Sequence, residues 1–390
     1  MVTASQREAG VAARTSLALV MLTATAAADD VDIIGRDPGW RVEDIQLRTT
    51  YLDQSGRGFQ SQAGALVGPG SEAMWLVQPW TQVRVRQSER VTHVVTIPVD
   101  VVTGASPDAV DAVSSASRTN ESVGLNVRST YRRSEADTFS LRAGVAAEEP
   151  LVTATLGSSW RRSFADDNAT VTLSGVVTYD GFDYRDLRGR YVGPALRWTY
   201  NGSIAISQLL SPTTIVDGSY GVTQQEGKLG SGWNAVPASG GTALASELLP
   251  HVRRRHALTG RISQHIPRSH STVKLAYRAY RDDFGIDAHT ITLAGYQYLT
   301  AWMYVRAGYR FHYQTGADFF TTMFLGNPND DDPRTADSDL AELHAHEWSL
   351  QLATLRSRKR PYSISAEVLR YERSNALQLT AISLAIGKSL

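Results

Sequence analysis

One stretch of the chain carries serine and threonine hydroxyls in a repeated pattern that suits phosphate chemistry. Asp100-Val-Val-Thr-Gly-Ala-Ser106 is followed, eleven residues later, by Asp111-Ala-Val-Ser-Ser-Ala-Ser117. An exposed hydroxyl in a turn of small residues lets a bulky phosphate group approach the backbone closely. The structural alternative is a polar loop that forms its own turns, because Asp and Ser side chains hydrogen-bond the neighbouring backbone.

The first copy is similar to the site at which periplasmic flavin transferases attach FMN through a phosphoester. In that resemblance Ser106 is the acceptor hydroxyl and the residues before it form the recognition turn. The second copy matches less well, because Ser115 replaces the glycine ahead of Ser117. The resemblance implies a covalent FMN cofactor and a site made of Asp100, Thr103, Gly104, Ser106, Asp111, Ser114 and Ser117.

Basic side chains recur at alternate positions of several segments, where they can attract anions. In Met303–Gln314 the odd positions are apolar or aromatic, whereas the even positions include Arg306 and Arg310. Side chains alternate across a strand, so one face is apolar and the other is basic. Along the chain this parity places eleven cations on the polar face: Arg84, Arg86, Arg128, Arg132, Arg142, Arg197, Arg261, Lys274, Arg278, Arg306 and Arg310.

Two interpretations of this basic face remain open. The same alternation of positions places chiefly two acids on the basic face, Asp217 and Glu367. A basic wall inside a low-dielectric shell focuses the field and favours anions. Alternatively, loops fold inward and their acids, such as Asp330–Asp332 and Asp337, pair with the arginines. Polar interiors occur both in open pores and in plugged barrels.

An acidic loop and a histidine pair are the candidates for a metal site. Asn327–Pro333 clusters the oxygen ligands that Ca²⁺ prefers, but it lacks the spacing and the closing Glu of an EF-hand loop. His344 and His346 share a face that continues into Trp348, which places them on the apolar side of a strand. We therefore predict no metal site.

Composition excludes several further classes of chemistry. The chain contains no cysteine, so disulfides, Cys-ligated zinc and iron–sulfur clusters are excluded. Lys+Arg and Asp+Glu both number 39, which gives no argument for binding nucleic acid. The chain also lacks the Gly-x-Ser-x-Gly, His-Glu-x-x-His and P-loop signatures. We therefore predict that the protein is not an enzyme and binds no nucleic acid.

Strands must position these side chains, and the chain shows strand periodicity almost throughout. The alternating segments run about 10 to 14 residues, near the length of a tilted membrane strand and about twice that of a typical soluble strand. Tyr and Trp gather near segment ends, as in an interfacial aromatic girdle. The pattern predicts an all-β protein that forms a transmembrane antiparallel β-barrel.

The connections between segments sort by length. Sixteen segments fit the pattern, namely 45–52, 73–86, 90–99, 121–133, 137–147, 151–163, 169–179, 191–209, 213–224, 255–266, 272–281, 287–298, 302–314, 344–356, 362–373 and 376–388. Every long connection has an odd number in chain order: 53–72, 100–120, 180–190, 225–254 and 315–343. We expect about 16 strands, within a range of about 14 to 18, with short periplasmic turns and long extracellular loops.

The N-terminus has the features of an export signal. Arg7 and Arg14 precede the apolar run Leu17–Leu22, and an Ala-x-Ala site ends at Ala28. The apolar run is too short to span a bilayer. We expect three parts: a cleaved signal peptide (1–28), a periplasmic N-terminal segment (29–44) and the outer-membrane β-barrel (45–390).

Several runs in the middle of the chain carry a family pattern. They are Tyr191–Tyr200 with Ser211–Asp217, Gly232–Pro237, Glu247–Pro250 with Arg255–Leu258, and Tyr309–Phe320. These runs resemble the uncharacterised bacterial family known as domain of unknown function 3570, and Tyr309–Phe320 is the most specific of them. The resemblance implies an exported bacterial protein with no established activity.

The sequence thus predicts a passive pore or scaffold with a basic lumen in the bacterial outer membrane. The expected partners are outer-membrane lipid and lipopolysaccharide, the barrel assembly machinery and small anionic solutes. A hypothesis from a different class is a redox barrel that carries covalent FMN at Ser106, and at Ser117, for extracytoplasmic electron transfer.

Overall fold

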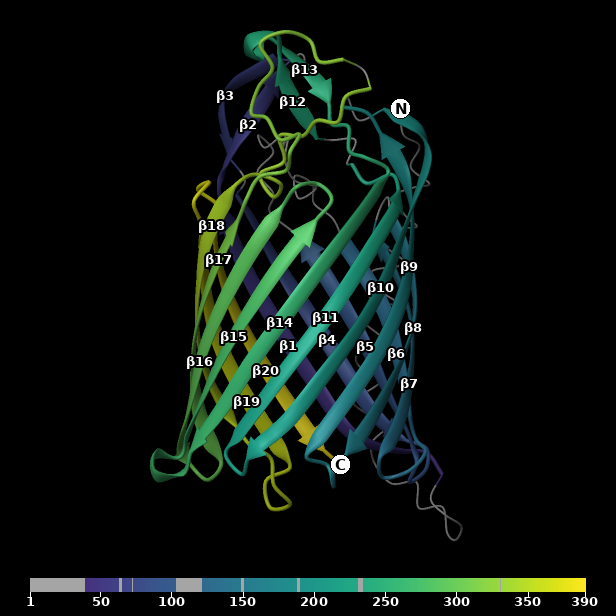
Figure 1. Cartoon of the computed structure of the whole chain (residues 1–390), viewed down its shortest axis with the longest axis vertical. Coiled ribbons are helices and arrows are strands. Elements are labelled where there is room, and N and C mark those ends of the chain that lie inside the picture. Colours follow the sequence, from purple (N-terminus) through teal and green to yellow (C-terminus); the bar gives the residue numbers. More distant parts are fainter. Residues whose placement is uncertain are drawn as a thin grey trace, which may run out of the picture. The chain divides into compact units, whose positions relative to one another are not determined.

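The wall of the molecule is a closed barrel of sixteen antiparallel strands (Figure 1). The computed structural model describes residues 39–62, 65–71, 73–102, 121–148, 151–187, 190–230, 234–329 and 331–390. In chain order the barrel strands are β1 (Arg41–Ser55), β4 (Met74–Arg86), β5 (Val91–Val102), β6 (Glu121–Arg132), β7 (Asp137–Glu148), β8 (Leu151–Phe164), β9 (Ala169–Arg185), β10 (Tyr191–Ser211), β11 (Thr214–Gly227), β14 (Val252–Ile266), β15 (Ser271–Asp282), β16 (Asp287–Thr300), β17 (Met303–Gln314), β18 (Leu343–Thr354), β19 (Tyr362–Arg373) and β20 (Gln378–Ser389). Pairing of β1 with both β20 and β4 closes the circle.

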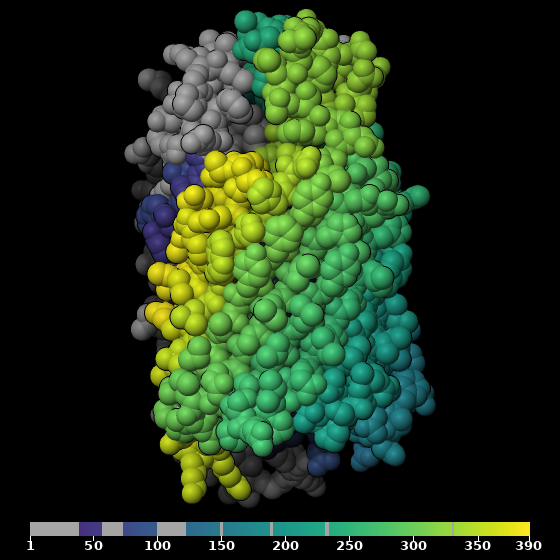
Figure 2. Space-filling model, turned by 60° about the vertical axis from the view of Figure 1, so that its left-hand side comes forward, coloured from purple at the N-terminus to yellow at the C-terminus, as the bar shows by residue number. Residues whose placement is uncertain are grey.

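The strands present an apolar face to the outside and a polar face to the lumen. On β7, Leu141 is 64% exposed, and on β14, Leu258 is 60% exposed. The alternate face of β14 carries Arg261, which forms an ion pair with Asp217 of the adjacent β11. Figure 2 shows the outside of this wall, on which the later strands form a continuous tilted surface. An apolar exterior around a polar lumen is the arrangement of bacterial outer-membrane barrels.

The sixteen expected strands are confirmed, with small differences at their ends. β1 begins at Arg41 rather than at 45, because Arg41 and Asp44 still pair with β4. The expected long connection 180–190 is largely strand, since β9 continues to Arg185. Asp180 does not break that strand, because it faces the lumen and forms an ion pair with Arg197 of β10.

The expected signal peptide (1–28) and most of the expected N-terminal segment (29–44) lie outside the described residues. In the part of the chain that the structure describes, no helix has the length and apolar composition to cross a membrane.

Two of the long connections contain short hairpins of their own. The first consists of β2 (Arg57–Gln62) and β3 (Ala65–Ser71), and the second of β12 (Ala235–Ala238) and β13 (Ala243–Ser246). A 3-10 turn, η1 (Ser239–Gly241), links β12 to β13. A second 3-10 turn, η2 (Pro267–Ser269), joins β14 to β15. Figure 1 shows the two hairpins beyond one end of the barrel, with the C-terminus at the other end.

Two loops, 228–251 and 315–342, fold against each other, and we call their described residues the cap. Their small hydrophobic core consists of Phe284 and Ile286, from the β15–β16 turn, with Ala317 and Leu340. The fully buried Thr335 donates a 2.6 Å hydrogen bond to Glu247 of the other loop. These contacts give the two long loops a packed core that a loop of comparable length in solvent would lack.

Candidate functional site

The polar face of the barrel brings together the cations that the sequence predicts there. All eleven occupy strand positions that alternate with residues of the apolar exterior. Five of them have a carboxylate partner: Arg86 with Glu43, Arg197 with Asp180, Arg261 with Asp217, Arg306 with Glu367 and Arg310 with Glu347. The other six, which form no ion pair with any described residue, are Arg84, Arg128, Arg132, Arg142, Lys274 and Arg278.

Three of these six cations lie in one row across neighbouring strands. Arg84 of β4 is paired in register with Val94 of β5, and Val94 is paired with Arg128 of β6. Arg128 is in turn directly opposite Arg142 of β7. We call Arg84, Arg128 and Arg142 the arginine row. All three side chains are exposed, although they face the inside of the barrel.

The remaining three cations contact neutral groups. Arg132 donates a 2.9 Å hydrogen bond to the carbonyl oxygen of Glu89. Lys274 places its Nζ 4.7 Å from the ring centroid of Tyr296, and Arg278 places its Cζ 5.7 Å from that of Tyr280. A cation–π contact or a carbonyl oxygen carries no formal negative charge, so it does not compensate Arg132 or Arg278. Lys274 also interacts electrostatically with the carboxylate of Asp217.

The ion pairs show that the lumen contains more acids than Asp217 and Glu367. Asp44 was assigned to the segment before the barrel, Asp180 to a loop and Asp282 to a turn, and all three form ion pairs with arginines. Glu347 lies within an expected strand, between two residues of the apolar face. Strand parity was therefore sufficient to place Glu347 in the lumen.

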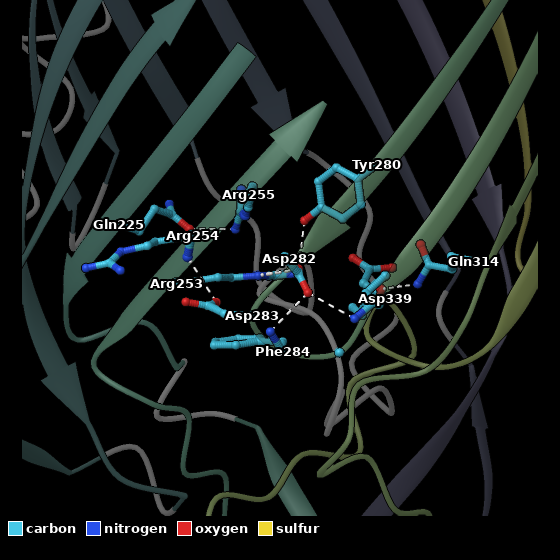
Figure 3. A network of polar contacts seen from close by, with 12 residues as sticks. Gln225, Arg253, Arg254, Arg255, Tyr280, Asp282, Asp283, Phe284, Gln314 and Asp339 are labelled. Carbon is cyan, nitrogen blue, oxygen red and sulfur yellow. Dashed lines mark hydrogen bonds and ion pairs between the residues drawn. The ribbon is translucent and has the colours of Figure 1, made fainter. Parts of the chain in front are cut away.

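A second polar network, which the sequence did not predict, joins the barrel wall to the cap (Figure 3). Its centre is the fully buried carboxylate of Asp282, which accepts hydrogen bonds from Arg253 at 2.9 Å and from the Tyr280 hydroxyl at 2.7 Å. The backbone N–H groups of Phe284 and Ile286 also donate to it, each at 3.0 Å. Asp282 therefore fixes the turn that supplies two residues of the cap core.

Among the described acids of the 315–342 loop, Asp339 is the one that forms an ion pair with a barrel arginine. Asp339 forms an ion pair with Arg373 of β19, and the Arg373 side chain is only 7% exposed. Asp332 instead accepts a hydrogen bond from Asn329 of its own loop. Asp330 lies outside the described residues. The interpretation in which loop acids fold inward and pair with arginines is thus supported by one ion pair, between Asp339 and Arg373. That interpretation named neither residue.

Asp337 of the cap is the loop acid with the most perturbed pKa. Burial, together with the nearby charges of Asp339 and Glu247, raises the pKa of the Asp337 carboxyl from 3.8 to about 7. A hydrogen bond from the backbone N–H of Asp339 and the charge of Arg373 act in the opposite direction. This carboxyl therefore titrates near neutral pH.

Most of the expected FMN site lies outside the described residues. These residues are Thr103, Gly104, Ser106, Asp111, Ser114 and Ser117. Asp100 belongs to β5 and is paired in register with Ser122 of β6. β5 ends at Val102, so the loop that carries the repeat begins at the same end of the barrel as the cap loops.

The histidine pair belongs to the outer aromatic surface. The His346 Nδ1 lies 2.8 Å from the Tyr309 hydroxyl oxygen, and its ring stacks on Trp348 at a centroid distance of 5.8 Å. His344 lies on the same face, with its ring centroid 5.9 Å from that of His346. No group of three or more potential metal-ligating side chains occurs among the described residues.

Comparisons with known proteins identify a family and a set of barrels. Residues 112–381 match the family described as "Protein of unknown function (DUF3570)". No curated protein matches the chain. A BenF-like porin from Pseudomonas fluorescens Pf-5 aligns with 90% of this chain and 99% of its own, at 8% identity and a TM-score of 0.46. The outer membrane protein opdK from Pseudomonas aeruginosa aligns with 89% and 98%, at 8% identity and a TM-score of 0.43.

A longer barrel protein is also similar. The siderophore receptor PirA from Pseudomonas aeruginosa aligns with 87% of this chain at 8% identity and a TM-score of 0.43, and the alignment covers 57% of the receptor. Identities and TM-scores this low transfer no substrate from any of these proteins to this chain.

Proposed function

The chain belongs to the DUF3570 family of proteins of unknown function, and we propose that it is a passive outer-membrane pore that favours small anions. The observation that carries this proposal is the arginine row. Arg84, Arg128 and Arg142 face the lumen, are exposed there, and form no ion pair with any described carboxylate. Arg84 is paired in register with Asp44 of β1, but the carboxylate of Asp44 forms its ion pair with Arg356. Arg128 and Arg142 therefore carry most of the preference. Uncompensated guanidinium groups on a lumen wall raise the local concentration of anions.

The ion-paired arginines contribute less to this preference. Arg306 and Arg310 lie 3.2 Å and 3.5 Å from the carboxylates of Glu367 and Glu347. An ion pair at such a distance acts as a dipole, whose field falls off faster than that of a single charge. We therefore assign the preference to the sector β4–β7, where the row lies, rather than to Arg306 and Arg310.

The cap does not occupy the strands that carry the row. Among the described residues, Lys228 of the cap donates a hydrogen bond to Leu196 of β10 and lies over the ring of Tyr184 of β9. Gln314 of β17 and Arg373 of β19 hydrogen-bond the 315–342 loop. None of these four strands belongs to the sector β4–β7. The arrangement suits a pore in which solutes pass along the row while the cap is held by other strands.

The pore proposal predicts stepwise conductance when the purified barrel inserts into a planar lipid bilayer. We expect ions to cross because the arginine row faces the lumen and its side chains are exposed there. Heat-denatured protein is the matched control, since it has the same composition but no closed barrel. Absence of conductance from protein that is still folded by gel mobility would contradict the pore and leave a closed scaffold or receptor.

The second candidate function is a redox barrel that carries covalent FMN. The observation that favours it is the eleven-residue repeat from Asp100 to Ser117, which has two similar turns where one would suffice to close a loop. β5 places the start of this loop beside the cap end of the barrel. Attachment to an exported protein would precede membrane insertion, because the loop faces away from the periplasm in the expected topology.

Intact mass spectrometry of protein from its native host tests this second candidate. Each attached FMN should add roughly 440 Da to the mature chain, and the flavin fluorescence should survive denaturation because the bond is covalent. Ser106→Ala should remove one such increment. An unmodified mass from cells that possess the transferase would contradict the redox hypothesis. The same spectrum tests the proposed cleavage, which predicts a mature chain that begins at Asp29.

The exterior suggests the partners of the folded protein. Leu141, Leu156 and Leu258 are among the apolar side chains that the barrel exposes. We propose that they contact outer-membrane lipid, that lipopolysaccharide surrounds the cap end, and that the barrel assembly machinery inserts the chain. Large exposed apolar surfaces of this kind mark contact with a membrane.

A further inference from the structure

We propose that Arg128 and Arg142 form a binding station for a phosphate group, supplied by inorganic phosphate or by a phosphate monoester. The inference rests on the proposed function and deepens it, because it names the class of anion that the lumen retains during passage. It concerns two residues of the arginine row, on the hairpin of β6 and β7.

The first observation is the direct opposition of two like charges. The register of β6 and β7 pairs Arg128 with Arg142, so their Cα atoms are about 4.5 to 5.5 Å apart. Like charges at directly opposed positions of a sheet destabilise it. The lumen elsewhere avoids this cost by pairing an arginine with an acid, as Arg306 does with Glu367. Here a bound anion would supply the missing negative charge.

The second observation is the neutral, polar floor around the two arginines. The next inward pair on one side is Asn126 with Gly144, and on the other side Thr130 with Ser140. Asn126 accepts a 3.3 Å hydrogen bond from Arg142, and the hydroxyl oxygens of Thr130 and Ser140 are 3.1 Å apart. These groups can hydrogen-bond an anion, and none of them competes with it as a carboxylate would.

The third observation is that Asn126 orients the Arg142 side chain. The Arg142 guanidinium donates to the Asn126 Oδ1, and a Cβ at Gly144 would lie 2.3 Å from that oxygen, so a larger residue at position 144 would displace the amide. On the other side, Gly157 of β8 is paired in register with Arg142, and the Val176 side chain of β9 fills the space that this glycine leaves, since a Cβ there would lie 2.9 Å from the Val176 Cγ2. The guanidinium of Arg142 is thus oriented by Asn126 and lies beside neutral residues.

The donor geometry selects the class of anion. A guanidinium presents its N–H groups as a planar fork, which matches two oxygens of a phosphate or carboxylate. Two forks from directly opposed residues supply donors for a tetrahedral dianion, which they match better than chloride, a single-atom anion. Arg84, two strands away in the same row, adds a third positive charge at longer range. We therefore assign the station to phosphate groups.

Isothermal titration calorimetry, with inorganic phosphate titrated into the detergent-solubilised full-length barrel, tests the proposal. We expect saturable binding that weakens by about tenfold or more in Arg128→Gln/Arg142→Gln, because the charge-assisted hydrogen bonds are lost. The matched control, Arg310→Gln/Glu347→Gln, removes one lumen ion pair without changing the net charge and should bind phosphate like the wild type. Heat-dependent gel mobility verifies that each variant is folded.

Further titrations distinguish inorganic phosphate from phosphate monoesters as ligands. They also separate the test of the station from the test of the pore. Glycerol 3-phosphate should bind if monoesters are accepted, whereas inorganic phosphate alone would restrict the station to the free ion; both outcomes support it. Absence of saturable phosphate binding, or equal binding by the Arg128→Gln/Arg142→Gln variant, overturns it. Phosphate binding without bilayer conductance would refute the pore but support the phosphate-binding station. Conductance without phosphate binding would support the pore but refute the station.

Discussion

Replacing Asp282 by alanine should open the cap while the barrel stays folded. The Asp282 carboxylate is fully buried and accepts hydrogen bonds from Arg253, Tyr280 and two backbone N–H groups. Without it, Arg253, which is only 13% exposed, would remain charged and unpaired. Breaking a buried ion pair by removing one partner typically costs about 3–5 kcal/mol. This lost free energy destabilises the cap, because Phe284 and Ile286 belong to the core of the cap.

Hydrogen exchange of the cap peptides measures this effect. Amides of 283–287 and 315–342 should lose protection in Asp282→Ala, whereas amides of the barrel strands should keep theirs. Asp217→Ala is the matched control, because Arg261 is 50% exposed and such pairs are worth about 0–1 kcal/mol. Equal protection of the cap in Asp282→Ala and the wild type would show that this network does not hold the cap.

The cap should lose stability as the pH rises from about 4 to about 7, the interval between the unfolded and folded pKa values of Asp337. Burial and the nearby charges of Asp339 and Glu247 raise the pKa of this carboxyl from 3.8 to about 7. Below 3.8 both the closed and the opened cap carry the proton, so there is no penalty. Between the two values the opened cap releases the proton and the closed cap retains it, which favours opening. Above about 7 the penalty is complete.

The size of the pH effect follows from the same shift. Three pKa units correspond to about 4 kcal/mol, and partial exposure of Asp337 reduces this to about 2 kcal/mol through solvent screening. Hydrogen exchange of the cap, corrected for intrinsic rates, should show weaker protection at about pH 8 than at about pH 5. In Asp337→Asn the protection should stay at its acidic level. A variant that keeps the full pH dependence would assign the effect to other groups.

The barrel could be predicted from the sequence because a membrane imposes one pattern on every strand. Each spanning segment must alternate lipid-facing and lumen-facing side chains, so parity alone placed Arg128 and Arg142 on the inner face. Their opposition was also predictable. The short connection between β6 and β7 fixes the register of the hairpin, which pairs Arg132 with Thr138, and the two arginines lie at equal distances from its central residue, Glu135.

The ion pairs and the cap could not be predicted in the same way. Arg306 and Glu367 lie on strands that are separated by β18, so their contact depends on two registers, one of which follows a long loop. The cap has no periodicity that identifies its core, and Phe284 and Leu340 meet only because two long loops fold together. The sequence places Asp180 and Asp282 in connections, because it does not reveal their arginine partners, Arg197 and Arg253.

The reversal potential across a bilayer with a salt gradient tests the central claim most directly, because it reports the charge preference of the lumen. We predict an anion-selective potential for the wild type. In Arg84→Gln/Arg128→Gln/Arg142→Gln the preference should disappear, whereas Arg310→Gln/Glu347→Gln, which removes a complete ion pair, should leave it unchanged. A cation-selective wild type, or a triple variant that is still anion-selective to the same degree, would contradict the assignment of selectivity to the arginine row.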